Sequence, residues 1–452
     1  MKKLLLITLM FIFAVTMLAK EVTLSVWTRA AETEKWRGLA AVEAAKDLNA
    51  ELKREGKDIT VKIDLAQSNP SWGDYKKKFT MACEAGKGPD IVLSGHEDVP
   101  IFGGTGKVVP IANSVSQIKG MAKEFDDVIE GLWSMAMWKG KIWAIPQDTE
   151  CRPMYYSKSK LKELGWSNSK IENLPNEIRD GKFTLDDMIE TAKEAIKKGV
   201  IKKGYGYWHR PRKGGDYMQY YVAFGGKMYD AKEDKLVVDK DALLKWYEFQ
   251  RKCVEQGVTP ENYIGTEWSI WHNTVSGNEA LFWNGGIWQW SEWIPRVEDK
   301  GGEPYMFKNF GYALQPSGIR GKKASQLSHP LVYFVVSEKA SGKKNQDLAT
   351  RLLEKMTTKE LNTNHAVGSS HLGILKSQVA YPAYKKSKIL SDALYMLDYA
   401  FYQPNHPYFS MYFDAVFKYM EESENGKLSP KKAVKKAVRV LKAEIGDQLI
   451  VQ

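Results

Sequence analysis

Cysteine is scarce in this chain, and the motifs of common metal and nucleophile chemistry are missing. The three cysteines, Cys83, Cys151 and Cys253, are an odd number and lie far apart, so no disulfide framework is expected. The sequence has no HExxH, no CxxC and no GxSxG, which argues against zinc proteases, zinc modules and serine hydrolases. Residues 103–107 are rich in glycine, but Val108 stands where a phosphate-binding loop needs Ser or Thr. We therefore expect no cofactor and no bound metal.

Long apolar runs are also missing, apart from one at the N-terminus. Two lysines precede an apolar run at residues 4–18, and Ala19 could close a cleavage site. The run is shorter than the roughly 20 residues that a membrane-spanning helix needs. We therefore interpret residues 1–19 as a cleavable secretory signal, and because no cysteine lies beside it, the protein is not expected to be a lipoprotein. The mature protein is expected in the periplasm or outside the cell.

Positive charge is in excess but nowhere concentrated. The chain has 66 Lys and Arg against 55 Asp and Glu, a formal net charge of +11. The lysines form separate short groups, which is typical of solvated surfaces rather than of a nucleic-acid site. A composition of 43% hydrophobic and 27% charged residues indicates an ordinary folded protein, and 452 residues exceed what one hydrophobic core usually serves. We expect two domains and no nucleic-acid partner.

Tryptophan is concentrated at residues 278–293 (NEALFWNGGIWQWSEW), which hold four of the 15 tryptophans around Gly285 and Gly286. The C–H face of a sugar ring is apolar, and an indole offers a large flat surface that packs against it. Glycines beside such rings let the backbone approach a ligand closely. The segment therefore predicts a carbohydrate site. The alternative is that its rings fill a hydrophobic core.

Strand and helix patterns alternate at the start of the chain. Residues 22–27 and 59–65 read as strands, and apolar residues at helical spacing predict a helix over residues 32–55. A third, buried strand follows. This order predicts an α/β fold with mostly parallel sheets flanked by helices, in which ligands bind beyond the carboxyl ends of the strands. The residues just past these strands, including Trp27 and Trp72, are therefore candidates for ligand contact.

Three segments of the chain resemble one known family, the extracellular solute-binding proteins (family 1) that bind carbohydrates for ABC transporters. These segments are GKGPDIVLSGHED at residues 86–98, WKGKIWAIPQDTECRPMYYSK at residues 138–158 and NGGIWQW at residues 284–290. The resemblance implies a two-lobed periplasmic-binding-protein-like fold (type II) with the ligand in the cleft between the lobes. It assigns residues 20–150 and 328–388 to the N-terminal lobe, and residues 151–327 and 389–452 to the C-terminal lobe.

The resemblance also assigns ligand-contacting positions. Trp288 is the leading stacking residue and Trp290 its neighbour, and the positions after the third strand are His96, Glu97 and Asp98. Glu150 stands where maltodextrin-binding members have a sugar-binding glutamate, with Asp148 as its companion, and Phe413 is expected to add an aromatic ring. The other candidates are aromatic and polar residues in or near the expected loops and strand ends: Trp27, Trp72, Trp208, His209, Asp216, Trp271 and His371.

The function that this resemblance implies is capture of a carbohydrate and its delivery to the membrane permease of an ABC transporter, by a monomer that is not an enzyme. Paired carboxylates such as Asp148 and Glu150 also leave an exported glycosidase open. Within binding proteins, the family arginine after the third strand is absent, and this favours a neutral sugar. The alternative is an anionic sugar derivative or a polyol phosphate, held by Arg152, Arg210 and Arg212.

Overall fold

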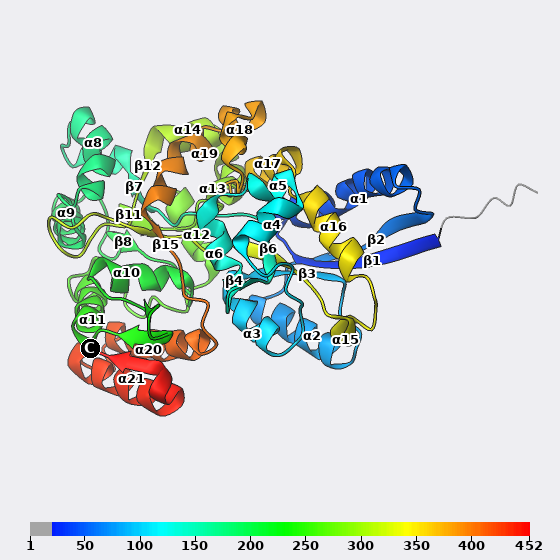
Figure 1. The fold of residues 1–452 in the computed structure, drawn as a ribbon. Coiled ribbons are helices and arrows are strands. Elements are labelled where there is room, and N and C mark those ends of the chain that lie inside the picture. Colours follow the sequence, from blue (N-terminus) through cyan, green and yellow to red (C-terminus); the bar gives the residue numbers. More distant parts are fainter. Residues whose placement is uncertain (1–19) are drawn as a thin grey trace, which may run out of the picture.

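The chain folds into two α/β lobes that lie side by side (Figure 1). The structure is a computed structural model and describes residues 20–452. The predicted secretory signal at residues 1–19 lies outside the described residues. Between residues 20 and 452, no helix has both the length and the apolar character needed to cross a membrane.

The first lobe is built on a five-stranded sheet in the order β2-β1-β3-β14-β6. Its strands are β1 (Lys20–Arg29), β2 (Ile59–Ser68), β3 (Ile91–Gly95), β6 (Ala144–Pro146) and β14 (Leu331–Val335). β1 is parallel to β2 and β3, which confirms the predicted opening of the chain. β14 is antiparallel to β3 and β6, because the chain returns from the second lobe at the edge where β3 ends and pairs Leu331 with Gly95.

Small residues let the long helix of the first lobe pack closely on this sheet. α1 (Trp36–Arg54) buries Ala41, Ala44, Leu48 and Leu52 at helical spacing. A Cβ at Gly38 would lie 2.4 Å from the Gln67 amide oxygen and 2.7 Å from the Leu65 side chain, so a larger residue here would have to displace these side chains of β2. α1 therefore confirms the helix predicted over residues 32–55.

The second lobe is built on a four-stranded sheet in the order β12-β7-β11-β8. Its strands are β7 (Met154–Ser157), β8 (Tyr207–Trp208), β11 (Phe282–Asn284) and β12 (Phe310–Ala313). β7 is antiparallel to both β11 and β12, whereas β11 is parallel to β8. Both sheets are therefore mixed. The α/β fold class is confirmed, but the prediction of mostly parallel sheets is wrong, because strands that follow a passage between the lobes enter their sheets in the opposite direction.

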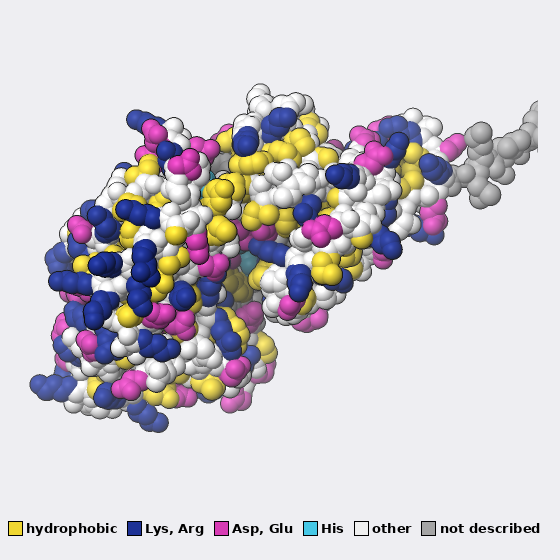
Figure 2. All heavy atoms as spheres, turned by 90° about the horizontal axis from the view of Figure 1, so that it is seen from below, with side chains coloured by type: hydrophobic (Ala, Val, Ile, Leu, Met, Phe, Trp, Pro, Cys, Tyr) yellow, Lys and Arg dark blue, Asp and Glu magenta, His cyan; other side chains and the backbone are white. Residues whose placement is uncertain are grey.

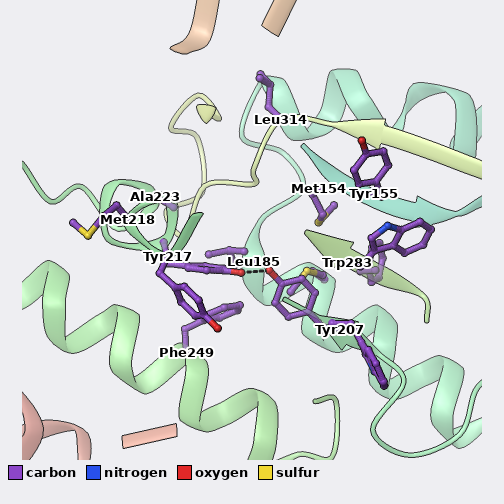
Figure 3. Close-up of a cluster of buried hydrophobic side chains, with 14 of the residues drawn as sticks. Met154, Tyr155, Leu185, Tyr207, Tyr217, Met218, Ala223, Phe249, Trp283 and Leu314 are labelled. Carbon is purple, nitrogen blue, oxygen red and sulfur yellow. Dashed lines mark hydrogen bonds between the residues drawn. The ribbon is translucent and has the colours of Figure 1, made fainter. Parts of the chain in front are cut away.

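Aromatic side chains fill the core of the second lobe (Figure 3). Tyr155, Tyr207 and Trp283 come from three strands, and Phe249 comes from α11 (Lys240–Glu255). The rings of Tyr155 and Trp283 stack with centroids 5.7 Å apart and planes 10° apart. Large rings of this kind bury much apolar area for few ordered torsions, which favours a core of this composition.

Side-chain capping fixes the start of one long helix of the second lobe. α9 (Leu185–Lys197) has a capping box, in which the Thr184 hydroxyl accepts from the Asp187 amide and the Asp187 side chain accepts from the Thr184 amide. α20 (Phe409–Glu424) and α21 (Pro430–Ile445) pack on each other and on α11 at the far end of this lobe (Figure 1).

The other elements are shorter or cover the edges of the two sheets. The helices are α2 (Trp72–Glu84), α3 (Val99–Gly104), α4 (Val115–Met121), α5 (Lys123–Asp126), α6 (Glu130–Met135), α7 (Lys158–Glu163), α8 (Asn168–Arg179), α10 (Met218–Ala223), α12 (Trp268–Ser276), α13 (Gln289–Trp293), α14 (Gly302–Asn309), α15 (Glu338–Ser341), α16 (Gln346–Met356), α17 (Lys359–Ser369), α18 (Pro382–Lys386) and α19 (Lys388–Ala393). The strands are β4 (Met137–Trp138), β5 (Lys141–Ile142), β9 (Tyr229–Asp230), β10 (Lys235–Val238), β13 (Gln326–Leu327), β15 (Ala400–Phe401) and β16 (Leu449–Val451).

Two separate hydrophobic cores correspond to the two sheets, and the chain passes between them after β6 and again before β14. The two passing segments are bonded to each other, with the hydroxyl oxygens of Thr149 and Ser328 2.7 Å apart. The backbone of Thr149 also exchanges two hydrogen bonds with Leu372. These bonds hold the polar residues of both segments at the junction of the lobes.

The three cysteines all lie in the described part of the chain, and each is buried and unpaired. Burial raises the pKa of the Cys151 and Cys253 thiols well above the ordinary value. They are therefore small core residues, in agreement with the expectation that no disulfide framework exists.

Candidate functional site

Trp288 lies at the junction of the two lobes, on the turn between β11 and α13. A Cβ at Gly286 would lie 1.9 Å from the Trp288 ring, so glycine is needed for the indole to fold back over the turn. The ring is half-buried, whereas the other three tryptophans of the segment are fully buried. It stacks on His371 of the first lobe, with ring centroids 5.5 Å apart and planes 10° apart. An indole face that is reached from both lobes is suited to a flat apolar ligand surface.

A buried ionic network surrounds the same ring. The Arg152 guanidinium donates to Glu150 at 2.6 Å and to Asp216 at 2.7 Å, and Arg210 donates to the other Asp216 oxygen at 2.8 Å. Both guanidiniums lie over the Trp288 ring, with their carbons 5.0 and 5.5 Å from its centroid. Burial would raise the pKa of Asp216, but the two arginines lower it below the ordinary value. Two positive and two negative groups therefore balance at the site.

On the side of the first lobe, the junction is bounded by the residues directly after β3, which we call the wall of the first lobe. His96, Glu97 and Asp98 form a short 3-10 helix there. The Lys76 ammonium lies 2.8 Å from Glu97 Oε1 and 2.7 Å from Asp98 Oδ2. His329 Nε2 lies 2.7 Å from the other Glu97 oxygen. Figure 2 shows the hollow between the lobes, with histidine and acidic side chains inside it.

Asp148 is buried beside this junction, and both of its oxygens are engaged. Oδ1 accepts from the Leu331 amide at 3.1 Å, and Oδ2 lies 2.9 Å from the Arg37 guanidinium and 3.1 Å from His365 Nε2. Burial would raise its pKa, but His371, Arg37 and His365 lower it below the ordinary range. Asp148 therefore supports His371 from within the first lobe rather than offering a free oxygen.

Three predicted tryptophans are not brought to the Trp288 ring. Trp290 is fully buried against Phe307, with ring centroids 4.8 Å apart, and Trp271 is fully buried against Trp293 at 5.8 Å. Trp208 lines a separate pocket of about 490 Å³. Trp290 is therefore a core residue, whereas Trp288 is half-buried and packs against the edge of the same core.

His209 and Phe413 also lie outside the junction. His209 is buried, with Nδ1 2.8 Å from the Tyr217 hydroxyl and Nε2 3.2 Å from a Glu424 oxygen. Phe413 packs parallel to Phe409 along α20, with ring centroids 6.4 Å apart. Both residues therefore belong to the packing of the second lobe.

The two tryptophans at the expected strand ends have different surroundings. Trp27 lies on β1 under the Lys78 ammonium, 4.8 Å from its ring centroid. Trp72 begins α2, with the Arg29 guanidinium 4.8 Å and the Lys76 ammonium 5.9 Å from its ring centroid. Since Lys76 also pairs with Glu97 and Asp98, Trp72 adjoins the wall of the first lobe, whereas Trp27 does not share these contacts.

Three further residues at the junction are not predicted from the sequence. Trp268 faces the Arg210 guanidinium at 4.8 Å, and Glu292 follows Trp288 by one helical turn. Burial and the nearby Glu34 carboxylate raise the pKa of Glu292 to about 7. The spacing of four residues from Trp288 is a signal that could have identified Glu292. His329, the third, has no local signal, since its partner Glu97 is 232 positions away.

The sequence of this chain matches a known protein family and a characterised relative. A family model described as bacterial extracellular solute-binding protein matches residues 38–363. The maltotriose-binding protein of Pyrococcus abyssi is 23% identical over 348 residues, which cover 74% of this chain. The chain spans 65% of the length of that relative.

Two solved structures show the same fold. The GacH receptor of Streptomyces glaucescens, whose structures include a complex with acarbose, matches with a TM-score of 0.73 and 18% identity, over 94% of this chain and 98% of that one. T. maritima MalE3 with bound maltose matches with a TM-score of 0.71 and 18% identity, over 93% of this chain and 99% of that one. The expected two-lobed fold is thereby confirmed.

Proposed function

The chain belongs to the bacterial extracellular solute-binding protein family, and on this premise we propose that it captures a neutral carbohydrate between its lobes for delivery to an ABC-transporter permease. Members of this family bind solutes and are not enzymes, so the glycosidase alternative is set aside. The observation that carries the proposal is the half-buried Trp288 ring at the junction, surrounded by carboxylates and guanidiniums. The ring supplies the apolar face that a sugar needs, and the charged groups supply hydrogen bonds to its hydroxyls.

The relatives support a glucose oligosaccharide as the ligand class. One is named for maltotriose, and the two solved structures have bound acarbose and maltose. The side chains that would contact such a ligand are those that the structure gathers around Trp288. We propose Glu150, Asp216 and His371 as its polar neighbours, with Trp72, His96, Glu97 and Asp98 on or beside the opposite wall.

We also propose that the lobes close on the ligand by a hinge motion. The N-terminal lobe would comprise residues 20–150 and 328–388, and the C-terminal lobe residues 151–327 and 389–452. The two separate cores and the paired passing segments support two lobes divided after β6 and before β14, although Ala366, Leu372 and Tyr384 pack in the core of the second lobe. Export by a cleaved signal at residues 1–19 and a monomeric state complete the proposal.

The balance of charge at the junction favours a neutral ligand over an anionic one. Arg152 and Arg210 are already paired with Glu150 and Asp216. Arg212, the third arginine considered for an anion, is exposed and lies 3.2 Å from Glu267. An anionic sugar would have to compete with the buried carboxylates for these guanidiniums. Breaking such buried ion pairs costs more free energy than hydrogen bonding to the hydroxyl groups of a neutral sugar.

A sugar that binds the cleft should raise the melting temperature of the purified mature protein. Ligand that binds only the folded state stabilises it by roughly 2.7 kcal/mol at a hundredfold excess over Kd. At least one of glucose, maltose, maltotriose and acarbose should raise the melting temperature, and the rise should increase with the concentration of that sugar. Galacturonate oligomers and a polyol phosphate form the matched anionic series. If all these ligands left the melting temperature unchanged, the proposed ligand class would be wrong.

Affinity for the sugar identified in this way should barely depend on salt. Ionic strength screens interactions between separated charges, and the screening length falls from about 30 Å at 0.01 M to about 8 Å at 0.15 M. Calorimetric titrations at these two ionic strengths should therefore give dissociation constants within about a factor of two. A decrease of tenfold or more in affinity at the higher salt would instead show that the ligand is recognised through its charge.

A further inference from the structure

We propose that His96, Glu97 and His329 form a binding site for a divalent transition metal ion, with Zn²⁺ as the best-suited ion. One donor atom from each of the three side chains lies within 4.8 Å of the other two. Two imidazoles and one carboxylate are a ligand set that Zn²⁺ uses, with the fourth position left for water or another ligand. This site stands on its own ligands and does not depend on which solute the cleft captures.

The hydrogen bonds around His96 leave one nitrogen free for a metal. Asn405 donates from Nδ2 to the carbonyls of Met135 and Met137, which fixes its Oδ1 as the atom that faces His96. His96 Nδ1 lies 2.8 Å from that oxygen and therefore carries the proton that it donates. His96 is fully buried, and its Nε2 has no hydrogen-bond partner among the described residues. A buried lone pair without a donor is costly unless a cation or a donor reaches it.

The arrangement around His96 is typical of a metal-ligating histidine. Such histidines usually donate their second ring N–H to an oxygen, which sets the tautomer and the ring orientation. Asn405 supplies that oxygen here.

The backbone already holds the three ligands together. His96 and Glu97 are neighbours in one 3-10 helix, and the His96 amide donates to the carbonyl of Pro330 at 3.2 Å, next to His329. His329 Nε2 lies 2.7 Å from Glu97 Oε2, and the two imidazole centroids are 5.0 Å apart. Ligand atoms around tetrahedral Zn²⁺ are about 3.3 Å apart, given bonds of about 2.0 Å. Side-chain rotations that move the donor atoms about 1.5 Å closer to one another would therefore complete the site.

The surrounding charge favours a cation at this place. Glu97 and Asp98 carry two negative charges, and Lys76 supplies one positive charge through Glu97 Oε1 and Asp98. Glu97 Oε2, on the side of His329, is not contacted by Lys76. His329 Nε2 pairs with that oxygen at 2.7 Å, so a divalent ion would displace the proton between them, and an anionic ligand such as hydroxide at the fourth position would offset the remaining positive charge.

A second cluster of similar composition serves as an internal control. Asp148, His365 and His371 also have donor atoms within 4.8 Å of one another. The Arg37 guanidinium lies 2.9 Å from Asp148 and 3.2 Å from His371, so a cation already occupies the centre of that cluster. Of these two clusters in the described part of the chain, we therefore infer that the metal binds at His96, Glu97 and His329 and not at Asp148, His365 and His371.

Calorimetric titration of Zn²⁺ alone into the chelator-treated mature protein tests this site. We expect one ion per chain with a dissociation constant of about 1 µM or tighter. His96→Gln and His329→Gln should each weaken binding about a hundredfold or more, and Asn405→Ala about 10- to 100-fold, since it supplies an outer-shell partner. His365→Gln, in the cluster held by Arg37, should change the affinity less than about threefold. Bound Co²⁺ should give visible absorption bands that His96→Gln alters.

Three results would overturn the proposal. They are no saturable Zn²⁺ binding by the wild-type protein, equal affinity in the wild type and in folded His96→Gln and His329→Gln variants, or loss of binding in His365→Gln instead. Sugar binding that fails while Zn²⁺ still binds would contradict the proposed function and leave the metal site intact. Zn²⁺ binding that fails while the sugar still binds would contradict only the metal site.

Discussion

Replacing Trp288 by alanine is expected to weaken sugar binding about thirty- to thousandfold while leaving the melting temperature nearly unchanged. Removing an aromatic side chain from the centre of a binding site typically costs about 2 to 4 kcal/mol of binding free energy. The half-buried Trp288 ring contributes less to the core than its fully buried neighbours do, so the loss of folding stability should be small. Calorimetry gives the dissociation constant, thermal melting gives the stability, and the fluorescence change on sugar binding should also decrease.

Trp290→Ala is the matched control for this prediction. Trp290 is fully buried, packs against Phe307 and donates its indole N–H to Glu303 at 2.8 Å. Its removal should cost roughly 3 to 5 kcal/mol of folding free energy through the cavity that it leaves, while the affinity of the folded protein is little altered. If Trp288→Ala lost stability but kept its affinity, Trp288 would be a core residue and the stacking assignment would fail.

Asp148→Asn is expected to destabilise the protein by about 3 kcal/mol with little change in sugar affinity. Breaking a buried ion pair by removing one partner costs about 3 to 5 kcal/mol, because the remaining charge is left unbalanced. The lower end applies here, since Arg37 keeps Glu34 as a partner at 2.7 Å. Denaturant unfolding measures the loss. An affinity that falls tenfold with unchanged stability would show that Asp148 contacts the ligand directly.

The difference in stability between the wild-type protein and Asp148→Asn should depend on pH. The folded-state pKa of Asp148 is lowered, so its contribution to stability is present above the unfolded-state pKa of about 4 and is lost as the pH falls below it. The wild-type protein is therefore expected to be more stable than Asp148→Asn at neutral pH, and this difference in unfolding free energy should shrink steadily as the pH falls below about 5. The double variant Arg37→Met with Asp148→Leu is the control, and it should be less destabilised than the sum of the two single changes.

The sequence predicted those features that local patterns determine. Alternation and helical spacing identified β1, β2 and α1. The positions past β3 remain a prediction, which rests on the family resemblance and on the rule that ligands bind at the carboxyl ends of parallel strands, such as β1 and β3. The direction of β14 was not predictable in this way, since it depends on where the chain returns from the other lobe.

The tryptophan content of residues 278–293 does not reveal which of its rings faces the junction. Trp288 and Trp290 are two residues apart, and each helical residue turns the side chain by about 100°, so their rings point to nearly opposite sides. One indole therefore faces the junction while the other fills the core. The ionic network was equally hidden, because Arg152 and Asp216 are 64 positions apart and only the folded chain brings them together.

The structure of the mature protein crystallised with the sugar that gives the largest melting shift tests the central claim most directly. The account predicts one sugar ring stacked on Trp288 at about 3.5 to 4 Å, with hydroxyls on Glu150 or Asp216 and both lobes in contact with the ligand. A sugar bound elsewhere, for example in the 490 Å³ pocket beside Trp208, with the junction free of ligand, would contradict it.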